Sequence, residues 1–229
     1  MAVVTNEGRQ DKSPVARFYD TLAPIYARLR DFGHKRDSGA KNLLITALAP
    51  FEEDVVLDIG TGPGVYAIDI AKHAPDSRVV GIDISEAFIG IAARRAGEAG
   101  LANISFALGN IEQLDFEDAS FTKIICAGVL SVVKKRRRAV AELARVLAPG
   151  GRLAVREPRR SDGALSRLIS GLPEKSGLRK TSSRMGLMFG HFSPEFMTET
   201  EIRALFDNTG LAEVEFQRCA GDVLITAVK

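Results

Sequence analysis

The sequence predicts an α/β fold in which a mostly parallel β-sheet carries helices on both faces. Three observations lead to this prediction. The run Val55–Ile59 is apolar without alternation, as expected of a strand buried on both sides of a parallel sheet. The glycine-rich turn Gly60–Gly64 follows it and leads into Val65–His73, which has helical spacing. A second apolar run, Arg78–Ile82, then ends at Asp83 and completes a strand–helix–strand unit.

The segment before this unit is expected to be helical. Residues 1–13 are polar and are expected to form a flexible N-terminus. From Pro14 onward, apolar side chains at helical spacing predict an amphipathic helix, with a break expected at Pro24: Val15, Phe18, Tyr19, Leu22, Tyr26 and Leu29. A second helix is predicted over Asp37–Leu48, ending before Pro50. Residues 14–50 therefore read as a helical cap, and residues 51–229 as the main domain.

The rest of the main domain continues the alternation. The pattern predicts in order a helix over Ser85–Ala99, strands over Asn103–Ala107 and Thr122–Ala127, a helix near Ala139–Leu147 ended by Pro149-Gly150-Gly151, and a strand over Arg152–Arg156. A basic insertion at about residues 157–198 fits no simple alternation and is expected on the substrate side of the domain, as a lining or lid of the crevice. Thr198 and Glu201 form a capping-box signature for a helix to about Asn208. The runs Ala212–Gln217 and Val223–Val228 predict an antiparallel hairpin, for seven strands in all.

Composition narrows the class of protein. A chain of 229 residues can hold one well-buried domain with a small cap or insertion. No apolar stretch has membrane-spanning length and Met1–Ser13 lacks a signal-peptide core, so we expect a cytoplasmic protein that is not transmembrane. The two cysteines, Cys126 and Cys219, are too few for a disulfide framework or a zinc site, and we expect no metal.

The glycine turn and Asp83 together suggest a ligand. Glycines let a ligand approach the backbone closely, and the amides of the following helix face the same crevice, which suits a nucleotide-like molecule. Asp83 can accept hydrogen bonds from two adjacent ribose hydroxyls. The carboxylate therefore selects a ribose and not a phosphate.

The spacing of the turn separates two cofactor classes. A nicotinamide- or flavin-dependent dehydrogenase favours Gly-x-Gly-x-x-Gly, whereas this turn reads Gly-x-Gly-x-Gly and has Val65 five residues after Gly60. Asp58 is unfavourable beside a pyrophosphate but suits a ligand with an ammonium and a sulfonium, both present in S-adenosylmethionine. A nicotinamide-dependent oxidoreductase stays open as an alternative.

An ordered series of motifs extends this interpretation. It comprises Asp58-Ile59-Gly60-Thr61-Gly62-Pro63-Gly64, Gly81-Ile82-Asp83-Ile84-Ser85, Gly109-Asn110-Ile111-Glu112-Gln113-Leu114-Asp115-Phe116, Glu117-Asp118-Ala119-Ser120-Phe121 and Leu143 to Leu153. Over Asp58–Gly151 the chain resembles the class I S-adenosylmethionine-dependent methyltransferases, within them the ubiquinone/menaquinone C-methyltransferase-like branch. The resemblance implies a Rossmann-like seven-stranded sheet, S-adenosylmethionine as cofactor and S-adenosylhomocysteine as product.

The resemblance also implies roles for particular residues. The glycines Gly60, Gly62 and Gly64 would pack on the methionine part of the cofactor, and Asp58 would orient the turn and the ammonium group. Asp83 would hold the ribose, and Asn110 and Ile111 would contact the adenine. Ala127 and Gly128 would pass beneath the methyl donor, and Thr61 and Ile84 are the remaining expected cofactor-binding residues. Tyr19 and Tyr26 match cap tyrosines that close over the cofactor. They could equally be aromatics that pack the cap helix onto the domain.

Candidates for acid–base chemistry are few. Glu157, just beyond the fifth predicted strand, is the best-placed carboxylate for removing a proton from the acceptor. His34 and His191 are further candidate bases, although surface imidazoles without a catalytic role are common. His73 reads as structural.

Charge adds a hypothesis about the acceptor. Lys134–Arg184 holds fifteen Lys and Arg against four Asp and Glu, a local net charge of +11 in a chain with a total of +2. This basic region favours an anionic acceptor or an anionic surface, the alternative being an ordinary solvated face. It also contains apolar residues, so a small-molecule or lipid-like acceptor with an anionic head fits: Leu165, Leu168, Ile169, Leu172, Leu187, Met188 and Phe189.

Several departures leave the acceptor open. The quinone-methylating branch carries an Arg-Asn pair after the fourth strand, where this chain reads Gly128-Val129-Leu130-Ser131-Val132. A nucleic-acid substrate is disfavoured because no Asn-Pro-Pro-Tyr-type motif is present. A non-catalytic protein that binds S-adenosylmethionine or an anionic surface remains the alternative from another class.

Overall fold

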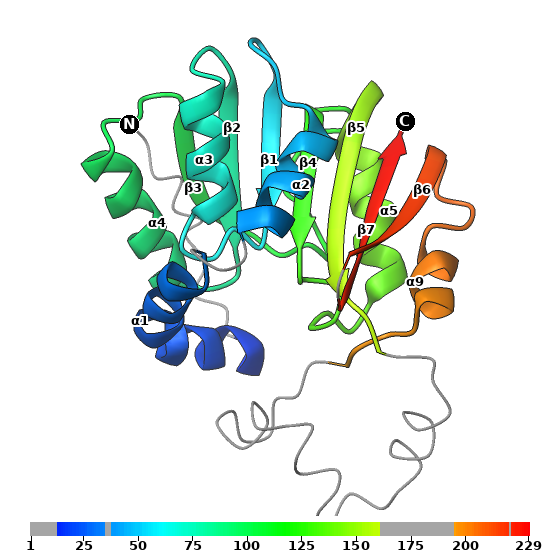
Figure 1. Cartoon of the computed structure of the whole chain (residues 1–229), viewed down its shortest axis with the longest axis horizontal. Coiled ribbons are helices and arrows are strands. Elements are labelled where there is room, and N and C mark those ends of the chain that lie inside the picture. Colours follow the sequence, from blue (N-terminus) through cyan, green and yellow to red (C-terminus); the bar gives the residue numbers. More distant parts are fainter. Residues whose placement is uncertain (1–12, 35–37, 161–194, 220) are drawn as a thin grey trace, which may run out of the picture.

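A seven-stranded sheet forms the centre of the molecule (Figure 1). The structure is a computed structural model that describes residues 13–34, 38–160, 195–219 and 221–229. The strands are β1 (Val55–Ile59), β2 (Arg78–Asp83), β3 (Ile104–Leu108), β4 (Phe121–Ala127), β5 (Leu147–Pro158), β6 (Ala212–Cys219) and β7 (Asp222–Val228). Their order is β3-β2-β1-β4-β5-β7-β6, and only the pairs β5–β7 and β6–β7 are antiparallel. The predicted α/β fold with its terminal hairpin is confirmed.

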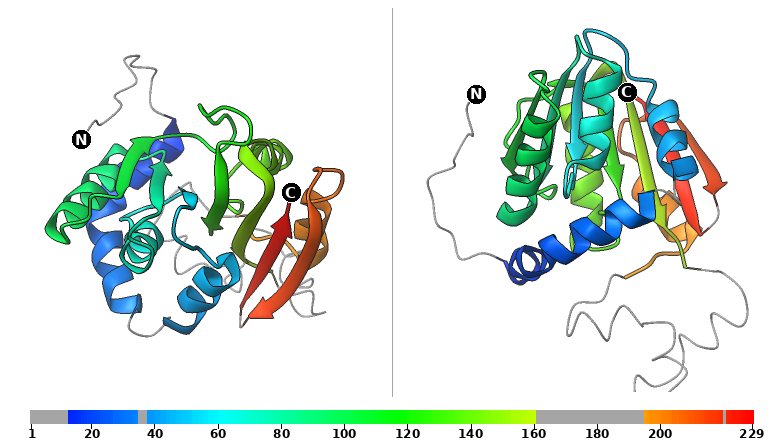
Figure 2. Two further views of the ribbon diagram at one scale, coloured as in Figure 1. Left: turned by 90° about the horizontal axis from the view of Figure 1, so that it is seen from above. Right: turned by 60° about the vertical axis from the view of Figure 1, so that its left-hand side comes forward.

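Helices cover both faces of the sheet (Figure 2). One face carries α2 (Ser38–Leu48), α3 (Val65–His73) and α4 (Glu86–Glu98), and the other carries α5 (Arg136–Val146) and α9 (Glu199–Leu205). In β1, Val56 packs with the first group and Leu57 with the second, and both side chains are fully buried. The central strand lacks polar alternation because each of its faces has its own core.

The strand order creates the crevice at which ligands bind in open α/β sheets. The chain leaves β1 toward β2 on one side, whereas β4 pairs with β1 on the other side. The segments that follow β1 and β4 therefore leave the sheet in opposite directions, and a space remains between these segments at the carboxyl ends of the two strands. Helix α1 (Pro14–His34) lies at these carboxyl ends (Figure 1), so the space has a helix across it.

The N-terminal helix is one element and not two. Pro24 was expected to break it, but helical structure continues through Pro24, and the two halves run in different directions (Figure 2). Proline removes one backbone donor and bends a helix without necessarily ending it. Here the buried residues Ala23 and Ala27 hold the chain on the domain on both sides of the bend.

Three predicted boundaries were wrong. Helix α5 begins at Arg136, before the predicted Ala139. The Glu112 carboxylate accepts a hydrogen bond from the Lys135 amide at 3.0 Å, at the start of this helix. This negative charge favours the helix start, because the first turn contains basic residues and no acidic ones. Strand β5 begins at Leu147, so Pro149-Gly150-Gly151 lies inside a strand whose register against β4 shifts. Helix α9 ends at Leu205 and not at Asn208.

Candidate functional site

A cavity of about 330 Å³ lies at the carboxyl ends of β1, β2 and β4, with α1 forming part of its wall. Most residues predicted to bind a cofactor line it: Tyr19, Tyr26, Gly60, Gly62, Asp83, Ile84, Asn110, Ile111, Ala127 and Gly128. These residues come from five separate segments of the chain. The sequence predicted these residues in separate motifs, and the fold brings them together around one cavity.

Two glycines of the turn open the cavity. Gly60 has φ +67°, and a Cβ there would lie 2.4 Å from Cγ2 of Val129, so no side chain fits between the turn and the opposite wall. Gly62 lies at φ +53°, a left-handed conformation that favours glycine, and its amide donates to Asp83. Gly64 does not line the cavity; a Cβ there would meet Ala92 of α4 at 3.0 Å, so this glycine permits close packing of α3 and α4.

Asp58 shapes the turn from behind. Its buried carboxylate accepts a hydrogen bond from the Thr61 hydroxyl at 2.6 Å and another from the Ala67 amide at 3.2 Å. Neither Asp58 nor Thr61 lines the cavity. Both residues therefore act on the form of the turn.

Asp83 is held in position by two backbone amides. Oδ2 accepts from the Gly62 amide and Oδ1 from the Ser85 amide, each at 2.9 Å. Burial raises the pKa of Asp83, while the Ser85 and Gly62 amides oppose that rise. An ionised carboxylate has about four acceptor sites, so Asp83 can accept a further hydrogen bond, for example from a hydroxyl group in the cavity.

Asn110 and Ile111 form another part of the wall. The side-chain oxygen of Asn110 accepts from the Glu112 amide at 2.9 Å, which fixes the direction of the carboxamide. Ile111 is 5% exposed and packs into the core beneath the cavity. Together they offer a polar edge beside an apolar surface.

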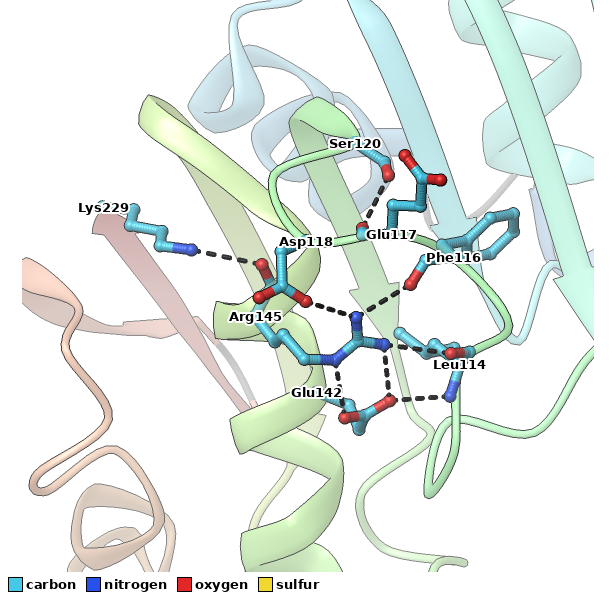
Figure 3. A network of polar contacts seen from close by, with 8 residues as sticks. All are labelled: Leu114, Phe116, Glu117, Asp118, Ser120, Glu142, Arg145 and Lys229. Carbon is cyan, nitrogen blue, oxygen red and sulfur yellow. Dashed lines mark hydrogen bonds and ion pairs between the residues drawn. The ribbon is translucent and has the colours of Figure 1, made fainter.

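A network around Arg145 anchors the segment that follows this wall (Figure 3). The guanidinium binds the Glu142 carboxylate through two bonds of 2.9 Å and also donates to the carbonyls of Leu114 and Phe116 and to Asp118. Hydrogen bonding from Arg145 lowers the pKa of Glu142. Sequence reasoning missed Arg145, for which the only signal was a Glu–Arg pair three residues apart on a predicted helix.

The cap tyrosines pack against α4. The Tyr26 ring meets the Phe88 ring edge-on at 5.4 Å between centroids, and the Tyr19 ring lies 6.1 Å from it. Burial raises the pKa of Tyr19 above that of an ordinary phenol, with Tyr26 and Asp83 adding to the effect. Both tyrosines pack as cap aromatics, and both also line the cavity.

The three candidate bases do not meet in the described part of the cavity. Glu157 is fully buried, is absent from the lining, and accepts from the amides of Leu130 at 2.7 Å and Ser131 at 3.2 Å. Its position therefore anchors the loop after β4. His34 is the last residue of α1, and His191 lies outside the described residues.

Glu157 leads to a prediction about stability. Burial raises the pKa of Glu157 from 4.5 to about 7, so the folded protein binds more protons than the unfolded chain between these values. Its stabilising contribution is complete below pH 4.5 and is lost as pH rises through 7, by roughly 3 kcal/mol at about 1.4 kcal/mol per pH unit. Urea unfolding between pH 5 and 8 should show this fall in wild type and in the exposed control Glu215→Gln, but not in Glu157→Gln. Parallel curves for all three proteins contradict the prediction.

The described part of the basic region is partly neutralised by ion pairs. Arg136 pairs with Glu195, Arg156 with Asp222 and Arg160 with Glu201. The exposed cations near the start of α5 are Lys134, Lys135, Arg137 and Arg138. Lys134 also lines the cavity. The apolar part of this region, Leu165–Phe189, lies outside the described residues.

Two further properties hold for the part of the chain that the structure describes. None of its helices is long and apolar enough to cross a bilayer. Its His, Cys, Asp and Glu side chains form no cluster of three that could hold a metal ion.

Comparison with known proteins places the chain in a family. A family model described as a methyltransferase domain matches residues 50–210. A probable methyltransferase of Aspergillus luteorubrus is 36% identical over 69% of this chain, and a demethylmenaquinone methyltransferase of Deinococcus radiodurans is 34% identical over 65% of it. The matched parts span 58% and 62% of those two relatives.

A solved structure agrees with the sequence matches. The solved structure of an S-adenosylmethionine-dependent methyltransferase from Methanosarcina mazei superposes with a TM-score of 0.60 and 26% sequence identity. The superposed part is 78% of the present chain and 93% of the Methanosarcina mazei chain. The family model alone spans more than half of the chain. The chain therefore belongs to the class I S-adenosylmethionine-dependent methyltransferases and is related to the quinone methyltransferases among them.

Proposed function

We propose that this protein transfers a methyl group from S-adenosylmethionine to a small or lipid-like acceptor that is apolar and carries a negative charge. The observation that carries the proposal is the composition of one cavity. Asp83 and the glycine turn line it together with Val129, Val132, Val133 and Lys134, which follow β4.

The cofactor half uses the residues singled out from the sequence. Asp83 accepts the two ribose hydroxyls, Gly60 and Gly62 admit the methionine part, and Asn110 with Ile111 meets the adenine. The Asp83 carboxylate lines the cavity and can accept further hydrogen bonds there, which supports this fit. Asp58, Thr61 and Gly64 contribute by shaping the turn, and Tyr19 and Tyr26 shield the cavity from water.

The acceptor half is apolar with one cation. The valines after β4 offer a surface for hydrocarbon, and the Lys134 ammonium at the start of α5 attracts an anion. The relative from Deinococcus radiodurans is named for demethylmenaquinone, an apolar quinone, which supports an apolar acceptor here. The exposed cations beside Lys134 extend the favourable field toward an approaching anionic molecule or surface.

The chemistry asks for positioning more than for acid–base groups. When bound, S-adenosylmethionine supplies a methyl group on a sulfonium, which is a good leaving group. The protein must hold the acceptor in line and exclude water. None of the described lining residues is a histidine. Lys134 favours the ionised form of an acidic acceptor, and an ionised acceptor needs no base.

The test compares two neighbouring lysines. Lys134 lines the cavity and Lys135 is exposed but absent from the lining, so Lys134→Gln and Lys135→Gln remove the same charge from different places. With a panel of quinols, acidic phenols and lipid acids, Lys134→Gln should raise the KM for an anionic acceptor about tenfold, the equivalent of one ion pair, while Lys135→Gln changes it little.

The same panel separates the alternatives. Calorimetry should show S-adenosylhomocysteine binding to wild type and both variants with similar affinity, and no NAD binding. Binding without turnover of any acceptor supports a non-catalytic protein. NAD binding without S-adenosylhomocysteine binding supports an oxidoreductase, and equal effects of the two lysine variants refute the role of Lys134.

A further inference from the structure

Asp20 lies on the cap helix and reaches the start of α4. Its Oδ1 accepts a hydrogen bond from the Ser85 hydroxyl at 2.7 Å and another from the Ala87 amide at 3.1 Å. Ala87 lies in the first turn of a thirteen-residue helix, where amides lack partners inside the helix and a negative charge is favoured. Asp20 therefore caps α4 from a different element of the chain.

Ser85 connects this contact to the cavity. Its backbone amide donates to Oδ1 of Asp83, while its hydroxyl accepts from the Phe88 amide at 3.2 Å and donates to Asp20. One fully buried serine therefore links the carboxylate on the cap helix to the carboxylate in the cavity wall. The two acidic groups therefore accept hydrogen bonds from two different donors of the same residue.

Apolar contacts make the same junction rigid. The rings of Tyr19 and Tyr26 lie against Phe88, which follows Ser85 by one turn of α4. Ala16, Ala23 and Ala27 of the cap helix are also buried. The cap helix therefore contacts the domain through a polar link at Asp20 with aromatic rings beside it.

We propose that Asp20 is a positioning residue that couples the seating of helix α1 over the cavity to the carboxylate of Asp83, acting through Ser85. The proposal rests on the proposed function, because it takes Asp83 as the group that holds the cofactor's ribose. A bound cofactor stabilises the seated helix, and the seated helix keeps Ser85 and Asp83 in position. Losing the link lets α1 leave the cavity more often, so the cofactor dissociates faster.

The test is a double-mutant cycle on cofactor affinity. Asp20→Ala, Ser85→Ala and the double variant are titrated with S-adenosylhomocysteine, with Thr21→Ala as control because Thr21 is exposed on the same helix and bonds only within it in the described contacts. Each single variant should weaken binding about tenfold, and the double variant by clearly less than the hundredfold product, since both remove the Asp20–Ser85 hydrogen bond. Asp20→Asn, which keeps an acceptor oxygen, should lose less. A hundredfold loss in the double variant makes the two residues independent and overturns the proposal.

A second readout separates coupling from a merely structural role. Arg17 and Arg28 are exposed on α1, so trypsin reports when this helix leaves the domain. S-adenosylhomocysteine should slow cleavage at these sites in wild type and in Thr21→Ala, but not in Asp20→Ala at saturating ligand. If S-adenosylhomocysteine still protects Asp20→Ala from trypsin, the proposed coupling is overturned, but the proposed function is not. A folded wild-type protein that binds no S-adenosylhomocysteine overturns the proposed function as well.

Discussion

Replacing Asp83 with alanine is expected to weaken S-adenosylhomocysteine binding at least a hundredfold. Under the proposed function the substitution removes the acceptor of two ribose hydroxyls, and a hydrogen bond to a charged group is worth about 1.5–3 kcal/mol. A hundredfold change in affinity corresponds to about 2.7 kcal/mol, so two such bonds suffice. Isothermal calorimetry measures the loss.

Two companion variants make this prediction specific. Asp76→Ala removes an exposed carboxylate from the turn before β2 and should bind like wild type. Asp83→Asn keeps one acceptor oxygen and should fall between. Because Asp83 also holds the amides of Gly62 and Ser85, urea unfolding must show that Asp83→Ala is folded at the titration temperature. Wild-type affinity in folded Asp83→Ala refutes its assignment to the ribose.

Gly60→Ala is expected to be the most damaging small substitution in the glycine turn. A Cβ at this position lies 2.4 Å from Cγ2 of Val129, and the backbone is at φ +67°, where an alanine is strained by roughly 1–2 kcal/mol. The turn and the cavity wall must move apart. Binding of S-adenosylhomocysteine should fall more than tenfold, with a loss of stability of about 2 kcal/mol or more.

The steric clash between an alanine at position 60 and Val129 can be relieved without relieving the backbone strain at that position. Gly60→Ala combined with Val129→Ala removes the colliding methyl groups and should recover part of the lost affinity, while the backbone strain remains. Gly90→Ala is the matched control, because nothing lies within 4 Å of a Cβ there and the residue is inside α4. Alanine is favoured over glycine in a helix, so this control should bind normally and unfold no earlier. Absence of rescue by Val129→Ala contradicts the steric explanation.

The parts of the site that could be predicted from sequence are local. The glycine turn, Asp83 and the pair Asn110-Ile111 each lie at or just after the end of a strand, and residues from all three line the cavity. A strand end and the turn after it are specified by neighbouring residues, since φ preferences and apolar runs act over a few positions. The capping box of α9, with Thr198 accepting from Glu201, was recognisable for the same reason.

Other features depended on residues distant in the chain. Arg145 contacts carbonyls 29 and 31 residues away, and Asp20 bonds to a hydroxyl 65 residues away. The early start of α5 needed the Glu112 carboxylate, which a helix pattern cannot reveal. Glu157 was singled out as a candidate base from its place after the fifth strand, but the structure surrounds it with backbone amides of another loop.

The sequence by itself determined the fold class and the family, and most of the residues that it predicted to bind a cofactor line the cavity, because strand, turn and acid recur within short motifs whose geometry is local. Only the tertiary structure decided which of these residues face the cavity and which shape it from behind, as Asp58, Thr61 and Gly64 do. It also decided how the cap helix is attached and which cation lines the cavity. These outcomes depend on hydrogen bonds and packing between elements far apart in the chain, whose partners are fixed only when the sheet and its helices are assembled.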